Sequence, residues 1–290
     1  MMWQSQNFPA TPKLLRTAAF IFLFLAASSI CVAQAVPAMS PGDAQALIRR
    51  AVHNELNSHD GLRFRFTIRK SDEKGITTKE IVQTADGDVA RLISSGDKPL
   101  TAEQAAAEKE RLDNLYNHPE IQAHRKNREH ADESRGDELA RVLPDAFLFT
   151  YAGMAETPSG PSVKLAFVPN PGFTPPDYEA RVFHGMAGEV WVDQRQERMT
   201  RFDAHLISDV EFGWGIFGKL FKGGTILVEA QDVGNHHWEQ THERLNLTGK
   251  ELMFKELVIN TTEDESNYQQ VPNNWTYKDA IHALENTPGK

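Results

Sequence analysis

Cysteine is almost absent from this chain of 290 residues, and its scarcity excludes two kinds of protein. Cys31 is the only cysteine, so a small fold stapled by internal disulfides is excluded. Because Cys31 lies in an N-terminal stretch that we expect to be cleaved off, the mature chain also has no cysteine nucleophile. The remaining 255 residues must be held together by apolar burial, which a chain of this size can provide.

Basic residues are also few. Lys and Arg total 31 against 40 Asp and Glu, which gives a formal net charge of −9. Loss of Lys13 and Arg16 with the N-terminal stretch leaves 29 basic residues against 40 acidic ones, a net charge of about −11. Such a surface repels phosphate groups, so it argues against nucleic acid and against non-specific attraction to anionic lipid surfaces. It permits a soluble carrier or a binding domain.

Common catalytic motifs are missing as well. The sequence has no G-x-S-x-G nucleophile turn, no H-E-x-x-H zinc motif and no glycine-rich phosphate loop after a strand. In the histidine-rich run HHWEQTHE, His236 and His242 would stand ~20 Å apart on a strand that rises ~3.3 Å per residue, too far for one ion. We therefore predict no enzymatic activity, no metal site and no cofactor; a hydrolase with an unrecognised site is the lesser alternative.

The first 35 residues have the pattern of a secretory signal peptide. Lys13 and Arg16 precede the apolar run TAAFIFLFLAASSI, and AQA at 33–35 fits a cleavage site. The apolar run is shorter than the ~20 residues that a membrane-spanning helix needs. We predict export to the bacterial periplasm with cleavage after Ala35 and no stable membrane span afterwards; an uncleaved anchor is the alternative.

The first half of the mature chain predicts a helix, three strands and a charged helical segment. Ser40 followed by Pro41 is a helix start, and apolar residues then recur at helical spacing until Gly61. LRFRFTIRK alternates apolar and polar residues and predicts a strand, and GITTKEIVQT and DVARLISS follow as further strands. Residues 101–141 have high helix propensity and charges of both signs, which predicts a helical pair over one edge of a sheet.

From Phe147 onward the pattern is a succession of strands with short links. A proline-rich loop interrupts them at 169–185, and a turn is predicted at LTGKE, 247–251. Trp275 and Tyr277 are expected to pack against the body from an otherwise polar C-terminal tail. The predicted strands are FLFTYAGM, SVKLAFVPN, GEVWVDQ, RMTRFDAHLI, GTILVEAQD, HHWEQTHERLNL and ELMFKELVI.

This order of elements predicts an α+β fold. We expect a strongly curved antiparallel β-sheet, a half-open barrel, with helices covering its concave face; a two-sheet sandwich is the alternative. The predicted organisation is a signal peptide at 1–35, one curved-sheet domain at 36–262 with the charged helical insertion 101–141, and a polar tail at 263–290.

The run GEVWVDQRQERMTRFDAHL resembles a recurring unit of bacterial envelope proteins, with Trp191, Asp193, Arg201 and Asp203 at the matching positions. Over about residues 40–95 and 145–260 the chain is similar to the superfamily of periplasmic (Lol-type) lipoprotein carriers and their lipid-binding relatives. The resemblance implies a half-open barrel that holds acyl chains under helical lids. Residues 101–141 and 169–185 depart from the compact carriers, and no functional residue is transferred from them.

Large aromatic side chains are the candidate ligand contacts, because a curved sheet cannot fill its own concave side. Ordinary core packing is the alternative for each of them. In EFGWGIFGKLFKGG, 211–224, we expect a strand and then a short helical turn at the mouth of the barrel, where its aromatics cover an acyl chain or plug the barrel end. The candidates are Phe64, Phe66, Trp191, Phe202, Phe212, Trp214, Phe217, Trp238 and Phe254.

The sequence therefore predicts a non-enzymatic periplasmic protein that binds a lipid or the acyl chain of a lipoprotein, in the manner of a carrier for outer-membrane biogenesis. The alternative is an envelope protein–protein interaction module that fills its own core and docks on a protein partner through the sheet or through residues 101–141.

Overall fold

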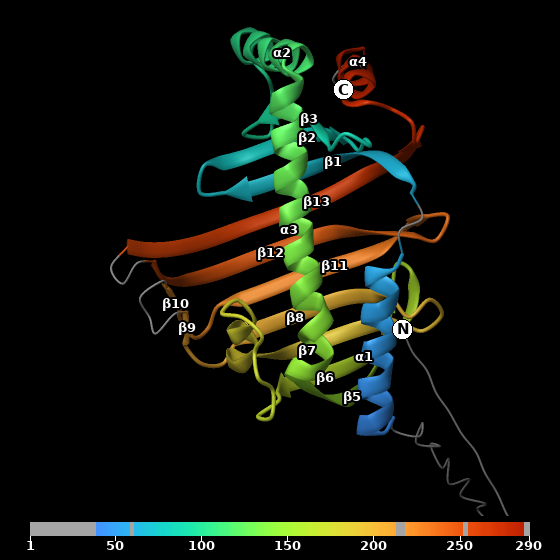
Figure 1. Ribbon diagram of the computed structural model, residues 1–290, viewed down its shortest axis with the longest axis vertical. Coiled ribbons are helices and arrows are strands. Elements are labelled where there is room, and N and C mark those ends of the chain that lie inside the picture. The colour runs from blue at the N-terminus through green and yellow to red at the C-terminus, as the bar shows by residue number, and fades with distance from the viewer. Residues whose placement is uncertain (1–38, 59–60, 213–217, 252–254, 287–290) are drawn as a thin grey trace, which may run out of the picture. The chain divides into compact units, whose positions relative to one another are not determined.

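The computed structural model describes residues 39–58, 61–212, 218–251 and 255–286 (Figure 1). Residues from Ala38 onward form one compact unit. The predicted signal peptide and its cleavage site lie outside the described residues, as do the candidate contacts Trp214, Phe217 and Phe254.

Four α-helices, one 3₁₀ helix and thirteen strands make up the described part of the chain. Three α-helices begin at a side-chain cap, which explains where they start: Ser40, Thr101 and Thr276 each accept a hydrogen bond from a backbone N–H of the first turn. In order, the elements are α1 (Pro41–Leu56), β1 (Arg63–Asp72), β2 (Gly75–Val82), β3 (Val89–Ser95), β4 (Lys98–Pro99), α2 (Ala102–Asn117), α3 (Pro119–Ala146), β5 (Phe147–Thr157), β6 (Gly160–Pro169), η1 (Ala180–Gly185), β7 (Met186–Asp193), β8 (Met199–Leu206), β9 (Val210–Phe212), β10 (Gly218–Leu220), β11 (Thr225–Gly234), β12 (His237–Glu251), β13 (Lys255–Val271) and α4 (Tyr277–Glu285).

All these strands join one 13-stranded sheet in the order β4-β3-β2-β1-β13-β12-β11-β8-β7-β6-β5, with β10 beside β12 and β9 beside β10. Every pairing is antiparallel. The α+β class with a large, unclosed antiparallel sheet is therefore confirmed. The half-open barrel and the helices over a concave face stay predictions.

Apolar residues of β5 to β8 form the largest core with α1 and the end of α3. Ile48 of α1 and Phe147, Leu165 and Val190 of the sheet are at most 1% exposed in this cluster. We call the face of the sheet that carries Leu165 and Val190 the helix face. On β5 to β8 the opposite face carries ion pairs such as that of Arg201 with Asp203.

A second core lies where α2 and α4 meet β2 and β3. Leu112 and Leu115 of α2 pack with Ile281 and Leu284 of α4, and all four are at most 3% exposed. Figure 1 shows these two helices together beyond β3. The predicted packing of Trp275 and Tyr277 against the body is seen here, because both side chains join this cluster.

The long helix α3 is held mainly at its two ends. Its first turns contact the β2–β3 turn, and its last turns pack on α1 and β5, so it runs across the sheet as Figure 1 shows. From Lys126 to Glu138 the side chains are exposed, except for half-buried Glu129 and Asp137. The helical segment predicted at 101–141 is thus a pair of helices, but only α2 covers an edge of the sheet.

Three boundaries differ from the prediction. The expected domain end at residue 262 falls inside β13, and the segment expected to be a polar tail contains α4, whose apolar side is buried. The predicted turn at 247–251 is strand, because β12 continues to Glu251. Gly249 allows β10 to approach β12 closely and does not form a turn, because a Cβ there would lie 2.2 Å from the carbonyl oxygen of Lys219 on β10. The helical turn predicted after Trp214 is wrong at Gly218–Leu220, which is β10.

Candidate ligand-binding site

A cavity of about 760 Å³ lies between α2 and the β3–β4 hairpin. One wall is β3 from Arg91 to Ser94, continued by the chain from Asp97 to Leu100; the other wall is α2. Glu285 at the end of α4 completes the lining. The helix contributes Ala105, Glu108, Lys109 and Leu112, which share one face because residues three or four apart are neighbours on a helix.

Apolar side chains form most of the interior of this cavity. Leu92 and Ile93 come from β3, Pro99 and Leu100 from the end of the hairpin, and Leu112 from α2. Leu92, Ile93 and Leu100 are half-buried, so their apolar surface is only partly covered by protein. An apolar chain entering the cavity would remove this surface from water, which is favourable.

Most charged groups at the rim are already paired. Asp97 binds Arg69 through two hydrogen bonds of 3.0 and 2.8 Å. Lys109 contacts Glu285 of α4 at 3.4 Å, and Glu108 accepts from the guanidinium of Arg111 at 2.7 and 2.8 Å. With these rim charges paired, the apolar interior is the part of the cavity that remains open to contact.

The side chains of α2 also explain why the cavity lies at this edge. Glu108 accepts a hydrogen bond from the backbone N–H of Leu92 at 2.7 Å, and Arg111 donates one to the carbonyl oxygen of Ala90. Both groups belong to the side of β3 that no strand pairs at this position. Helix α2 therefore satisfies an edge strand that would otherwise expose its backbone groups.

The early aromatic candidates lie in a small core on β1 and β2. Phe64 and Phe66 are 3% and 6% exposed and pack with Ile81. Phe64 stacks on the ring of His237 at 4.5 Å, and Phe66 stacks on Tyr268 at 4.8 Å between ring centroids. Protein side chains therefore cover both rings.

The later aromatic candidates occupy different places. Phe202 stacks on Phe167 at 5.2 Å and, like Phe212, packs against the largest core. Trp191 lies on the opposite face, with the guanidinium of Arg201 at 5.1 Å from its ring. None of the described candidates lines the cavity, and whether they also contact a ligand stays a prediction.

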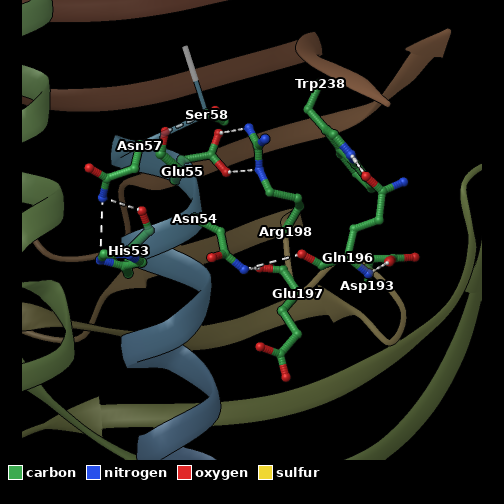
Figure 2. A network of polar contacts seen from close by, with 10 residues as sticks. All are labelled: His53, Asn54, Glu55, Asn57, Ser58, Asp193, Gln196, Glu197, Arg198 and Trp238. Atoms are coloured by element: carbon green, nitrogen blue, oxygen red, sulfur yellow. Dashed lines mark hydrogen bonds and ion pairs between the residues drawn. The ribbon is translucent and has the colours of Figure 1, made fainter. Parts of the chain in front are cut away.

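Trp238 belongs to a polar network that joins α1 to the β7–β8 turn (Figure 2). Its Nε1 donates to Gln196 at 3.0 Å, and the guanidinium of Arg198 lies 5.8 Å from its ring centroid. Arg198 donates to both carboxylate oxygens of Glu55 at 2.8 and 3.0 Å. In the same turn, buried Asp193 accepts the backbone N–H of Gln196 at 2.6 Å. Asp193, the acidic residue of the Trp-x-Asp pattern recognised in the sequence, thus stabilises this turn.

Two half-buried carboxyl groups on the β1–β3 side of the sheet have raised pKa values. Burial raises the pKa of Asp88 to about 7, and the neighbouring carboxylates of Glu129 and Glu133 on α3 raise it further. Burial also raises the pKa of Glu265 to about 7, although a hydrogen bond from Tyr268 opposes the shift. Sequence reasoning missed both groups, because their burial depends on elements far away in the chain.

The histidine-rich run places its rings on protein partners. Nε2 of His237 lies 3.0 Å from Glu239, and Nδ1 of His242 lies 2.7 Å from Asp264. Among the residues that the structure describes, no three His, Cys, Asp or Glu side chains gather as they would around a metal ion. In the same residues, no helix is both long and apolar enough to cross a membrane.

Comparison with known proteins gave likenesses among solved structures. No protein-family model matches the chain, and no curated protein sequence does. The chain is similar to a DUF1329 family protein from Desulfovibrio piger, with 11% identity over 78% of this chain and 92% of that one and a TM-score of 0.27. A putative outer membrane lipoprotein-sorting protein domain from Vibrio parahaemolyticus has 7% identity over 85% and 100%, with a TM-score of 0.29. A LolA superfamily protein from Nitrosomonas europaea has 9% identity over 79% and 95%, with a TM-score of 0.25. The superfamily that the sequence resembles is among these structures.

Proposed function

We propose that this protein binds the acyl chain of a lipid or lipoprotein in the cavity between α2 and β3, without chemistry on the ligand. The observation that carries the proposal is the cavity itself: about 760 Å³, with Leu92, Ile93, Leu100 and Leu112 among its lining. Ligand sites are typically apolar hollows of ~300–1,000 Å³ with a few polar groups, and this cavity lies within that range.

The energetics suit a chain-like ligand. Each methylene removed from water contributes ~0.8 kcal/mol, so about ten methylenes would contribute roughly 8 kcal/mol before ordering costs. The predicted export to the periplasm places the protein where lipids and lipoproteins pass between membranes. In this proposal the protein acts as a carrier in outer-membrane biogenesis.

Native mass spectrometry of protein purified from its own periplasm tests the function directly. We expect a co-purifying species with the mass of a lipid or an acylated peptide. A protein partner of defined mass without lipid would instead favour the interaction module, for which the exposed middle of α3 is the candidate surface. Protein free of lipid that also fails to take up added lysophospholipid would refute lipid binding.

A matched pair of variants tests the location. Ala105 lines the cavity, whereas Ala107, two residues further along the same helix, does not; both are exposed alanines. Ala105→Trp should fill the cavity and weaken lysophospholipid binding at least ~10-fold, a loss of about 1.4 kcal/mol. Ala107→Trp should leave binding unchanged. Normal binding by Ala105→Trp together with weak binding by Phe202→Leu would place the ligand among the aromatic candidates instead.

A further inference from the structure

The turn between β2 and β3, residues 85–88, is where α3 is fastened to the sheet. Gln122 donates to the carbonyl oxygen of Asp86 at 2.9 Å, and Lys126 donates to that of Ala85 at 2.9 Å. In the other direction, the backbone N–H of Asp88 donates to Glu129 at 3.1 Å. Three successive turns of α3 thus bind one short turn of the chain.

The contact between this turn and α3 is close. Gly87 has a φ of +93°, and a Cβ there would lie 2.9 Å from a carboxylate oxygen of Glu129 and 3.0 Å from the Cβ of Lys126. Gln122 is 1% exposed, and its Oε1 has no hydrogen-bond partner among the described residues. The junction therefore has no spare volume and incomplete polar pairing, so a new charge within it is expensive.

The junction is also connected directly in the chain to both walls of the cavity. Asp88 immediately precedes β3, which forms one wall, and α3 directly follows α2, which forms the other. The carboxylate of Asp86 accepts the N–H of Tyr277 at 3.3 Å, so the same turn also binds the start of α4. Helix α2 is itself held to β3 by Glu108 and Arg111, so separation of α3 from this turn would loosen α2 from its C-terminal end, where α3 begins.

The groups that face the Asp88 carboxyl are mostly acidic. Glu129 and Glu133 face it from α3 and Glu239 from β12, and the only opposing cation among the influences on it is Arg63 of β1.

The nearby cations of α3 are directed elsewhere. Arg125 donates to the backbone oxygen of Asp88 at 3.5 Å, and Lys126 donates to that of Ala85. On the turn itself, the carboxylate of Asp86 is directed to α4. An ionised Asp88 would therefore add a fourth negative charge to three carboxylates. Arg63 compensates in part, and Arg125 and Lys126 are bound to backbone oxygens of the turn.

We infer that the β2–β3 turn and α3 form a proton-operated latch on the cavity, closed when the Asp88 carboxyl is neutral and loosened when it is ionised. The identity of the ligand rests on the proposed function. The motion of the latch belongs to the fold and can be measured with no ligand present. Ionisation weakens the hold of the turn on α3, α2 moves away from β3, and the cavity becomes easier to enter and leave. Because the pKa of the half-buried Asp88 carboxyl is raised to about 7, the latch responds to modest changes of pH around that value.

Hydrogen exchange tests the latch without ligand. Amide exchange in 112–129, corrected for the intrinsic pH dependence, should become about tenfold faster between pH 6 and pH 8 in the unmodified protein. Asp88→Asn should remove this pH dependence, and Glu129→Gln should move its midpoint to lower pH. Asp132→Asn is the matched control, because that carboxylate lies on the exposed part of α3. Exchange that is independent of pH in the unmodified protein, or pH-dependent in Asp88→Asn, would overturn the latch.

A second measurement separates the latch from the proposed function. The probe is pyrene-labelled lysophosphatidylcholine, whose charge does not change over this pH range. We expect its uptake to be about tenfold faster at pH 8 than at pH 6, and equal at both pH values in Asp88→Asn. If amide exchange depends on pH but the probe is not taken up at any pH, the latch is supported and lipid binding is refuted. Uptake with equal rates at both pH values in the unmodified protein would refute the regulation and leave the binding function intact.

Discussion

The ion pair between Glu55 of α1 and Arg198 of the β7–β8 turn predicts an asymmetric response to mutation. Two hydrogen bonds of 2.8 and 3.0 Å join the two side chains, which lie 143 residues apart in the sequence. Their environments differ: the side chain of Arg198 is 8% exposed, whereas that of Glu55 is 34% exposed. Removal of either partner breaks the same bonds but leaves a different charge behind.

The magnitudes follow from which charge is stranded. Glu55→Ala leaves a guanidinium buried without its counter-ion, which costs about 3–5 kcal/mol of unfolding free energy. Arg198→Met leaves a carboxylate that water still reaches, so its cost is about 1–2 kcal/mol, including the lost contact of the cation with Trp238. We expect Glu55→Ala to be about 2 kcal/mol more destabilising than Arg198→Met.

Urea unfolding followed by far-UV circular dichroism measures the difference. The double variant Glu55→Ala/Arg198→Met should be more stable than Glu55→Ala alone, because the stranded cation is gone. Arg50→Ala is the control: Arg50 binds Glu197 on the same turn but is 53% exposed, so its loss should cost less than ~1 kcal/mol. Equal losses for the two single variants, or a larger loss for Arg198→Met, would refute the idea that burial of the unpaired charge sets the cost.

Three further predictions concern stability. Burial raises the pKa of Glu265 from 4.5 to about 7, so the folded state holds this proton more tightly than the unfolded state. The contribution of this group to stability should therefore be complete below pH 4.5 and be lost as the pH rises through 7. Glu265→Gln should remove up to about 3 kcal/mol of that fall, measured by urea unfolding at pH 5 and pH 8. Gly249→Ala should cost more than ~2 kcal/mol, because its Cβ would meet the carbonyl oxygen of Lys219; an unchanged melting temperature would contradict the close approach. Gly136→Ala, with nothing within 4 Å of the added Cβ on helix α3, should instead stabilise the protein by about 0.5–1 kcal/mol, and a lower melting temperature would contradict this.

Local patterns predicted the strands well because they depend on near neighbours in sequence. The alternation in 62–70 gave β1, and the cap at Ser40 gave the start of α1. What the local pattern could not supply is pairing between distant segments. The first strand in the chain, β1, pairs with the last, β13, with Arg63 opposite Val271. This pairing makes the expected polar tail part of the fold.

The candidate site was harder to predict for the same reason. Leu92 and Leu112 of the cavity look like ordinary core residues in sequence, and only the distance between β3 and α2 leaves space beside them. Aromatic side chains gave a stronger signal, but their surroundings decided their role. Trp191 lies under Arg201 because the neighbouring strand places an arginine opposite it, a fact of register and not of composition.

The position of the cavity follows from how the sheet ends. At the β3 edge, α2 is anchored by Glu108 and Arg111 to two backbone groups, at Leu92 and Ala90. Beyond those anchors the outer side of β3, away from β2, pairs only with the two residues of β4. No further strand fills the space between this hairpin and the helix. A helix that protects an edge at one point and spans a short hairpin at the next leaves apolar side chains facing a gap. Protection of the edge and formation of the cavity are therefore consequences of the same placement of α2.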